Sequence, residues 1–337
     1  MYLDFYGLKE KPFNLTPDPR FLYLTPAHRD ALSQLVYGVQ EEKGFIVLTG
    51  EVGTGKTTLL QSLIRELDNT TEVALVVHSK LQFDDLLEYA IEDFGVKTQA
   101  TSPAQRLFAL NEFLIDQHQA GRNSVLILDE AQHLEPETLE QVRLLSNFET
   151  PTTKLLQILL VGQPELEARL ALDQLRQLRQ RIGLRCRIHP LSLEESRDYI
   201  LSRLRIAGAI DFSIFTEEAI SRIAAYAGGI PRVVNMVCDH CLLFGFADQK
   251  RQIDQGIVEQ AIEYLEQGSP RLSATSPMPT QPSQTAETSV PLRRIGSWVE
   301  TLLAIIGVIV FIGVVTMLLY PEIIAKLVHR LAELVSF

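Results

Sequence analysis

The sequence predicts an α/β protein in which helices flank a parallel β-sheet, with a smaller helical domain after it. Short apolar runs alternate with helical patterns up to residue 190, as parallel strands buried on both faces do. After residue 190 the patterns are helical only. The expected strands are residues 45–50, 73–78, 124–130, 155–162 and 184–190, and the expected later helices lie near 193–207, 216–227, 231–246 and 254–266.

Composition indicates an acidic, reduced, globular protein. The 337 residues carry a net charge of −11, and residues 1–267 hold 26 Lys and Arg against 38 Asp and Glu. Binding to DNA or RNA depends largely on basic surface, so this balance disfavours nucleic acid as a partner. Cys186, Cys238 and Cys241 form an odd set without paired spacing, as in reduced thiols. No secretory leader is visible at the N-terminus.

The composition changes sharply after residue 267. Residues 268–296 are rich in Pro, Ser and Thr and predict a disordered linker. Residues 301–320 are an uncharged apolar run, flanked by Trp298 and Tyr320, which predicts a transmembrane helix within residues 297–320. Residues 321–337 form an amphipathic tail that we expect at the far membrane surface or against a partner helix.

Residues 50–57 read GEVGTGKT and satisfy the phosphate-binding pattern G-x-x-x-x-G-K-[ST] between a strand and a helix. Such a loop surrounds phosphates with backbone N–H groups at a helix N-terminus. We expect Lys56 to contact the β- and γ-phosphates and Thr57 to bind Mg²⁺. The predicted nucleotide-contacting residues are Gly50, Glu51, Val52, Gly53, Thr54, Gly55, Lys56, Thr57 and Thr58.

Two acids end the apolar run VLILDE, which we expect to be a strand neighbouring the one before the loop. Asp129 is predicted to bind Mg²⁺, and Glu130 to act as the base that activates water. Gln163 follows another apolar run and is predicted to sense the γ-phosphate, the role called sensor 1. No N-K-x-D tetrapeptide for reading guanine occurs, so ATP is the expected nucleotide.

Arginines supply two further predicted catalytic residues. Arg181 lies just before the last predicted strand, where an arginine can reach the γ-phosphate of a neighbouring subunit; Arg185 is the second choice. Both belong to a cluster that could instead be a solvated helix face or a nucleic-acid patch; its members are Arg176, Arg179, Arg181, Arg185 and Arg187. Arg232 follows Pro231 at a predicted helix start, where its charge needs an anion, and we predict that it binds the γ-phosphate as sensor 2.

Together these segments resemble the ATPase domain of the GspA/ExeA family, which is associated with general (type II) secretion. The resemblance covers about residues 1–267 and rests on GEVGTGKTTL, ILDEAQHL, LLVGQPEL, LRQRI, GGIPRVVN and the opening FYGLKEKPFNLTPDPRFLYLTPAH. It implies a P-loop NTPase of the AAA+ type with a C-terminal helical lid, ATP and Mg²⁺ as cofactors, and ATP-dependent oligomerisation. Family members of the secretion type usually carry a periplasmic peptidoglycan-binding domain. Here only residues 321–337 follow the predicted span, so a separate membrane partner is expected.

The predicted organisation has six parts: an N-terminal arm (1–30), an AAA+ core (31–190), a lid (191–267), a linker (268–296), a transmembrane helix (297–320) and a tail (321–337). We expect a homo-oligomer such as a hexamer in the bacterial inner membrane, with the ATPase domain cytoplasmic. Its expected partners are membrane lipid and an inner-membrane or periplasmic protein of a secretion, pilus or polysaccharide-export system.

Some alternatives remain open at this point. The chain could be a DNA-binding AAA+ regulator of the transposition-targeting type, or a nucleotide-gated scaffold with little turnover. In the N-terminal arm, His28 and Tyr23 are expected either to contact the adenine or simply to pack. Cys238, His240 and Cys241 lack the second ligand pair that structural zinc needs. His78 and Ser79 are a candidate tether for Glu130.

Overall fold

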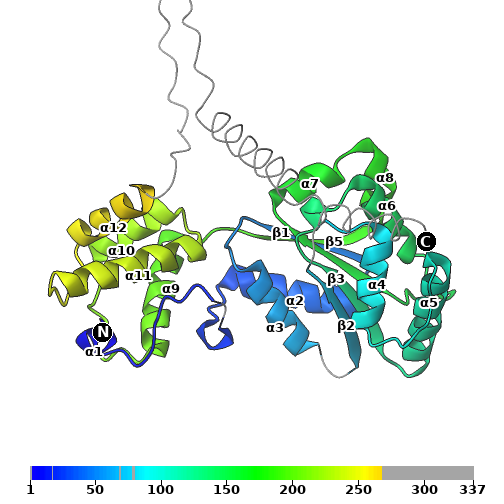
Figure 1. The fold of residues 1–337 in the computed structure, drawn as a ribbon, viewed down its shortest axis with the longest axis horizontal. Helices are drawn as coiled ribbons and strands as arrows, with labels where there is room; N and C mark the ends of the chain where they lie inside the picture. The colour runs from blue at the N-terminus through cyan, green and yellow to red at the C-terminus, as the bar shows by residue number, and fades with distance from the viewer. Residues whose placement is uncertain (1, 17, 68–69, 78–79, 268–337) are drawn as a thin grey trace, which may run out of the picture. The chain divides into compact units, whose positions relative to one another are not determined.

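The computed structural model describes residues 2–16, 18–67, 70–77 and 80–267. Its sheet has five parallel strands in the order β2-β3-β4-β1-β5 (Figure 1). The fold class predicted for this part of the chain is therefore present. The strands are β1 (Phe45–Gly50), β2 (Thr71–Val76), β3 (Asn123–Leu128), β4 (Gln157–Gly162) and β5 (Ile182–Ile188).

Helices cover both faces of the sheet because the central strands are apolar on both faces. In β4, Ile158 and Leu160 face one layer of helices, while Leu159 and Val161 face the other. The second layer consists of α2 (Pro26–Gln40) and α3 (Lys56–Glu66). The first consists of α4 (Phe83–Asp93), α5 (Pro103–Gln119), α6 (Pro136–Leu145), α7 (Pro164–Leu170) and α8 (Arg176–Arg181).

The strand bounds differ slightly from the predicted ones. Strands β2, β3 and β5 end earlier than their apolar runs, because these runs include the first residues of the following loops. Glu130, for example, has a left-handed backbone with φ of 54°, which a strand cannot contain. The prediction that β3 neighbours β1 was wrong, since β4 lies between them.

Four helices form the lid: α9 (Leu193–Ile206), α10 (Glu217–Ala227), α11 (Pro231–Ala247) and α12 (Gln255–Gln267). Ser192 and Thr216 cap the first two through their hydroxyl groups. The helices begin and end within a residue or so of their predicted positions, because the caps and the Pro231 start are legible in the sequence.

The N-terminal arm belongs to the lid core. Its helix α1 (Tyr2–Tyr6) packs on α11, and Phe13 and Phe21 are buried among apolar side chains of the lid. Short 3₁₀ turns complete the secondary structure at Pro19–Phe21, Ala131–His133 and Asp173–Leu175. The arm and the lid thus share one hydrophobic cluster, although the sequence pattern places them at opposite ends of the folded part.

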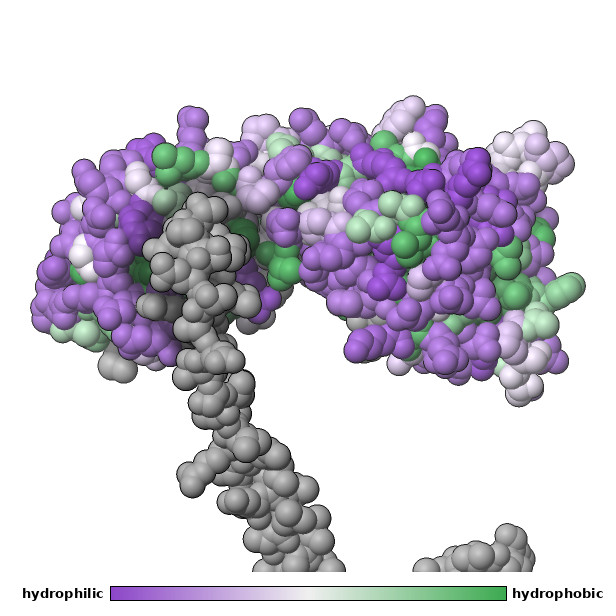
Figure 2. All heavy atoms as spheres, turned by 90° about the horizontal axis from the view of Figure 1, so that it is seen from above, coloured by the Kyte–Doolittle hydropathy of each residue, from purple (hydrophilic) through white to green (hydrophobic). Residues whose placement is uncertain are grey.

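Within residues 2–267, so far as they are described, no helix is long and apolar enough to cross a membrane. The predicted linker, transmembrane helix and tail lie outside the described residues. Figure 2 shows a face that is mostly hydrophilic, with hydrophobic residues in small separate groups.

Candidate nucleotide-binding site

The loop between β1 and α3 has the backbone conformation that the phosphate-binding pattern requires. Gly53 and Gly55 have φ of 81° and 100°, values that side chains disfavour, and Gly55 is the N-cap of α3. Thr54 donates its hydroxyl hydrogen to the Glu51 carbonyl at 2.8 Å, which closes the turn. The first N–H groups of α3 are therefore available to an anion.

Lys56 is the buried cation of this loop, with 6% of its surface exposed. Its ammonium donates to the carbonyls of Gly50 at 2.8 Å and Glu51 at 3.0 Å. Burial lowers the pKa of Lys56, while the charges of Glu130 and Asp129 oppose this shift. A phosphate group in the loop would add a further anionic partner for this desolvated cation.

Asp129 and Thr57 are brought together at the edge of the sheet where β3 and β1 end. Asp129 is also buried, with 6% exposure, and accepts a hydrogen bond from the Glu130 backbone N–H at 2.9 Å. The Thr57 hydroxyl is close enough to favour the ionised form of Asp129 and so lowers its pKa. Burial raises the pKa of Asp129, and a divalent cation would reverse that effect. This carboxylate and hydroxyl are hard oxygen ligands of the type Mg²⁺ prefers, so they fit the predicted metal.

Glu130 is held by two side-chain amides. Its Oε2 accepts hydrogen bonds from Nε2 of Gln132 at 2.6 Å and from Nε2 of Gln163 at 3.2 Å. Burial by itself raises the pKa of Glu130, but these bonds and the Lys56 charge outweigh it and lower the pKa below its usual value. The carboxyl group is thus ionised near neutral pH, as a general base must be.

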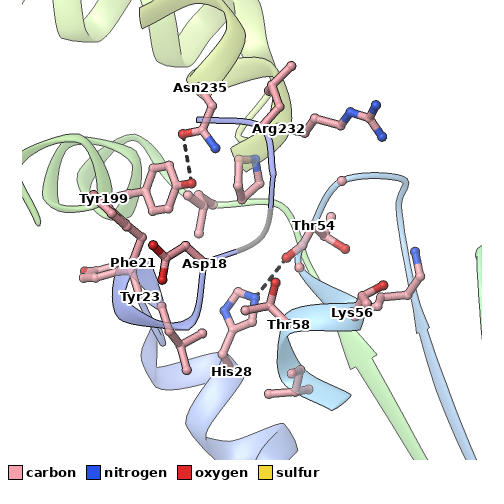
Figure 3. Close-up of a pocket in the computed structure, with 18 of the residues that line it drawn as sticks. Asp18, Phe21, Tyr23, His28, Thr54, Lys56, Thr58, Tyr199, Arg232 and Asn235 are labelled. Carbon is pink, nitrogen blue, oxygen red and sulfur yellow. Dashed lines mark hydrogen bonds between the residues drawn. The ribbon is translucent and has the colours of Figure 1, made fainter. Parts of the chain in front are cut away.

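A cavity of about 370 Å³ lies over the loop and is bordered by the lid and the N-terminal arm (Figure 3). Lys56, Thr57, Glu130 and Arg232 all line it. Arg232 is the second residue of α11, and its backbone N–H approaches the Gly53 carbonyl at 3.4 Å. Within the described part of the chain its guanidinium group has no hydrogen bond or ion pair, so it is available to an anion.

The opposite end of the cavity is aromatic and is formed by the arm. Phe21, Tyr23 and His28 line it, as Figure 3 shows. The His28 ring lies within hydrogen-bond distance of the Thr25 hydroxyl (2.7 Å, Nδ1) and the Thr54 carbonyl (3.1 Å, Nε2). His28 therefore connects the first turn of α2 to the phosphate loop, and Tyr23 contributes to the wall of the cavity.

The two predicted finger arginines are bound within their own chain. Arg181 donates to the Asn147 side-chain oxygen at 2.7 Å and also to the Ser146 hydroxyl, at the C-terminal end of α6. Arg185 pairs with Glu167 at 2.6 Å. Both side chains are on the surface, where such bonds exchange readily.

The structure also describes the three residues of the lid that were considered as zinc ligands. Cys238 and Cys241 are completely buried in the lid core, and Nδ1 of His240 lies 2.8 Å from the carbonyl of Met236. The tether predicted from His78 and Ser79 lies outside the described residues.

Sequence reasoning missed Gln132, which contacts both Glu130 and Gln163. The sequence indication for Gln132 is an amide residue two positions after Glu130. The reasoning also missed Arg203 of α9, which is buried and donates to the Pro12 carbonyl and the Tyr199 hydroxyl. The sequence indication for Arg203 is an arginine among the apolar positions of the lid.

Comparisons with known proteins agree with this geometry. Residues 39–170 match the family described as AAA domain. General secretion pathway protein A of Aeromonas hydrophila is 42% identical over 262 residues, which are 77% of this chain and 48% of that protein. The uncharacterized HTH-type transcriptional regulator MJ0774 of Methanocaldococcus jannaschii is 26% identical over 255 residues, 70% of this chain and 60% of that protein. The chain thus spans about half the length of the curated relatives it matches.

Two solved structures illustrate the likeness in fold. The Aeropyrum pernix ORC2 protein in ADPNP–ADP complexes has a TM-score of 0.58 at 17% identity, over 79% of this chain and 74% of that one. CDC6P from Pyrobaculum aerophilum has a TM-score of 0.57 at 19% identity, over 74% and 71%. At such low identity these likenesses establish the fold alone.

Proposed function

This chain belongs to the AAA ATPases of the general secretion pathway protein A type, and on that premise we propose that it hydrolyses Mg-ATP as a membrane-anchored oligomer. One observation supports ATP hydrolysis in particular. A single cavity large enough for a nucleotide is lined by Lys56 of the phosphate loop, the ionised Glu130 and Arg232, whose guanidinium group has no partner among the described residues. Their combination serves phosphoryl transfer, in which positioning and charge stabilisation do most of the work.

Each residue then has a defined task. The loop N–H groups and Lys56 bind the phosphates, while Thr57 and Asp129 would hold the Mg²⁺, which neutralises charge on the phosphate oxygens. Glu130 accepts a proton from the attacking water, and Gln163 contacts the γ-phosphate or this water. Arg232 joins the γ-phosphate from the lid, so the lid position depends on whether that phosphate is present.

We place the adenine at the aromatic end of the cavity. Phe21 and Tyr23 offer flat apolar surface there, and the His28 ring is bonded to the phosphate loop. Because the arm packs in the lid core, base binding and phosphate binding would both act on the lid.

The membrane part of the proposal rests on sequence and relatives. The apolar run at residues 301–320 has the length of one bilayer crossing, and ATP chemistry requires the N-terminal domain to face the cytoplasm. The relative from Aeromonas is named for a secretion pathway. We propose that the chain is a single-pass inner-membrane protein that assembles or energises a secretion, pilus or polysaccharide-export machine through a partner in the membrane or periplasm.

The test is ATPase turnover of the full chain, purified in detergent, as a function of protein concentration. We expect Mg²⁺-dependent ATP hydrolysis whose specific rate rises with concentration, and loss of turnover in Glu130→Gln with ATP still bound. A chain that binds ATP but does not turn it over would instead be a nucleotide-gated scaffold. Tight, salt-dependent and ATP-dependent retention of duplex DNA would favour the DNA-binding regulator.

A further inference from the structure

Gln132 joins Glu130 and Gln163, the two residues to which the proposed function assigns the attacking water and the γ-phosphate. Its Nε2 donates to Oε2 of Glu130 at 2.6 Å, and its Oε1 accepts from the backbone N–H of Gln163 at 3.0 Å. Gln163 in turn donates from its own Nε2 to the same Glu130 oxygen at 3.2 Å. These contacts close a three-residue ring between the loop after β3 and the loop after β4.

The surrounding structure fixes Gln132 in this place. Its side chain is 5% exposed, within the short turn after Glu130. At Gly162, the last residue of β4, a Cβ atom would lie 2.7 Å from Oε1 of Gln132, so the glycine leaves room for the amide. A buried amide with both of its ends bonded has a single favourable orientation.

The chemical consequence concerns the orientation of the base. Two amide donors converge on Oε2 of Glu130, which leaves Oε1 as the oxygen with free acceptor capacity for water. The Glu130 backbone is in the left-handed region, which non-glycine residues disfavour. Contacts with neighbouring residues are therefore needed to hold Glu130 in this conformation. Only a side chain with one donor and one acceptor can hold Glu130 and the Gln163 backbone at once.

We propose that Gln132 is a positioning residue that aligns Glu130 and Gln163 for hydrolysis without contributing to nucleotide affinity. The inference deepens the proposed function and rests on it, because it assigns how the same base is oriented. Gln132 does not line the nucleotide cavity, so it acts through its two neighbours.

Two substitutions of similar size separate the contacts. Gln132→Met removes both hydrogen bonds, and Gln132→Glu keeps the acceptor for Gln163 but removes the donor to Glu130. Gln157→Met is the matched control. Gln157 is also buried, lies at the other end of β4, and bonds the Gly44 N–H at 2.7 Å and the Lys154 carbonyl at 3.1 Å.

The measurements are kcat and KM for ATP, and the Kd of a fluorescent ATP analogue, on the full chain. Misplacement of a catalytic group by a fraction of its contact distance costs roughly 10- to 100-fold, so we expect kcat to fall by this factor in both Gln132 variants. The analogue Kd should change by less than about threefold, which is well under 1 kcal/mol.

The inference is overturned if kcat in both Gln132 variants stays within about threefold of the parent while Glu130→Gln abolishes turnover. It is also overturned if Gln157→Met lowers kcat equally, or if the analogue Kd rises in step with the loss of rate. A parent chain without any ATPase activity would be a different result, because it would remove the proposed function and this inference together.

Discussion

Gly53 joins the phosphate loop to the lid at a position where a side chain has no room. Its φ of 81° is unfavourable for other residues, and an added Cβ would lie 2.7 Å from the Cβ of Arg232. The same backbone atoms contact α11, because the Gly53 carbonyl accepts from the Arg232 N–H. The close approach of the lid to the loop thus depends on this single residue.

We predict that Gly53→Ala weakens ATP binding by about tenfold or more, because Arg232 and the start of α11 must move away from the loop. Gly121→Ala is the control. Gly121 has a similar φ of 71° but nothing within 4 Å of an added Cβ. Both variants should lose about 1 kcal/mol of stability to backbone strain, and only Gly53→Ala should lose nucleotide affinity. Equal affinities in a titration with a fluorescent analogue would refute the lid contact.

The cysteines provide a prediction on pH dependence. Burial raises the pKa of the Cys186 thiol to about 11, and burial also raises the pKa values of Cys238 and Cys241. Only the thiolate reacts, and at pH 8 about one Cys186 thiol in a thousand is ionised. We expect no labelling of the folded protein by iodoacetamide at pH 8, faster labelling as the pH rises, and three labels in denaturant. Mass spectrometry would detect any rapid native labelling, which would contradict this burial.

The sequence was informative about residues whose chemistry depends on local spacing. Lys56, Thr57, Asp129 and Glu130 follow strands and could be placed from the pattern alone. Gln132 could not, because its function depends on a contact with Gln163, which is distant along the chain and adjacent only in the folded sheet. Its assignment required the strand order, which no local pattern encodes.

At the scale of elements, the N-terminal arm and the lid act as one unit. Arg203 of α9 donates to the Pro12 carbonyl, and its guanidinium lies 4.8 Å from the centre of the Phe21 ring. Tyr199 accepts a hydrogen bond from Arg203 at 2.8 Å and donates one to Asn235 of α11 at 3.0 Å. A movement of the lid would therefore carry with it the arm that walls the aromatic end of the cavity.

We predict that Arg203→Ala lowers the stability by about 2–4 kcal/mol, because it leaves buried carbonyl and hydroxyl groups without a donor and removes a cation–π contact. Proteolysis should then cut the arm before the core. Arg197→Ala, on the same helix, is the control, since Arg197 makes an exposed ion pair with Glu217 and should leave Tm nearly unchanged. The prediction fails if thermal unfolding and limited proteolysis give the same result for the two variants.

The elements themselves were largely predictable from the sequence. Apolar runs located the five strands, and amphipathic periodicity located the lid helices. Both were legible because an element buried on one or two faces has apolar residues at the corresponding positions of its sequence. The assignment of the arm to the lid was not predictable. Phe13 and Phe21 read only as apolar residues in a proline-rich segment, and their partners are near the far end of the folded part.

At the scale of the whole molecule, Lys56, Glu130 and Arg232 line the nucleotide cavity, whereas no arginine of α8 or β5 is among the described residues that line it. Arg181 and Arg185 are at the surface and bonded to their own chain in the described part. An arginine that serves the site of the next subunit must be at the surface, so this placement is compatible with a finger acting in trans. Substitution of Arg181 alone is ambiguous, since it also removes the bonds to the end of α6.

Mixing two inactive variants resolves this ambiguity. Glu130→Gln lacks the base and Arg181→Ala lacks the finger, so each should be nearly inactive alone. In a randomly mixed oligomer, about one interface in four joins an intact Glu130 to an intact Arg181 from the neighbouring subunit. We expect equimolar mixing to restore up to about a quarter of the parent ATPase rate, because each site needs a residue from both chains. Arg176→Ala in place of Arg181→Ala controls for general loss of surface charge, because Arg176 is another exposed arginine of α8. If the mixture hydrolyses ATP no faster than the sum of its two components, while size-exclusion chromatography shows that mixed oligomers form, Arg181 does not act across the subunit boundary.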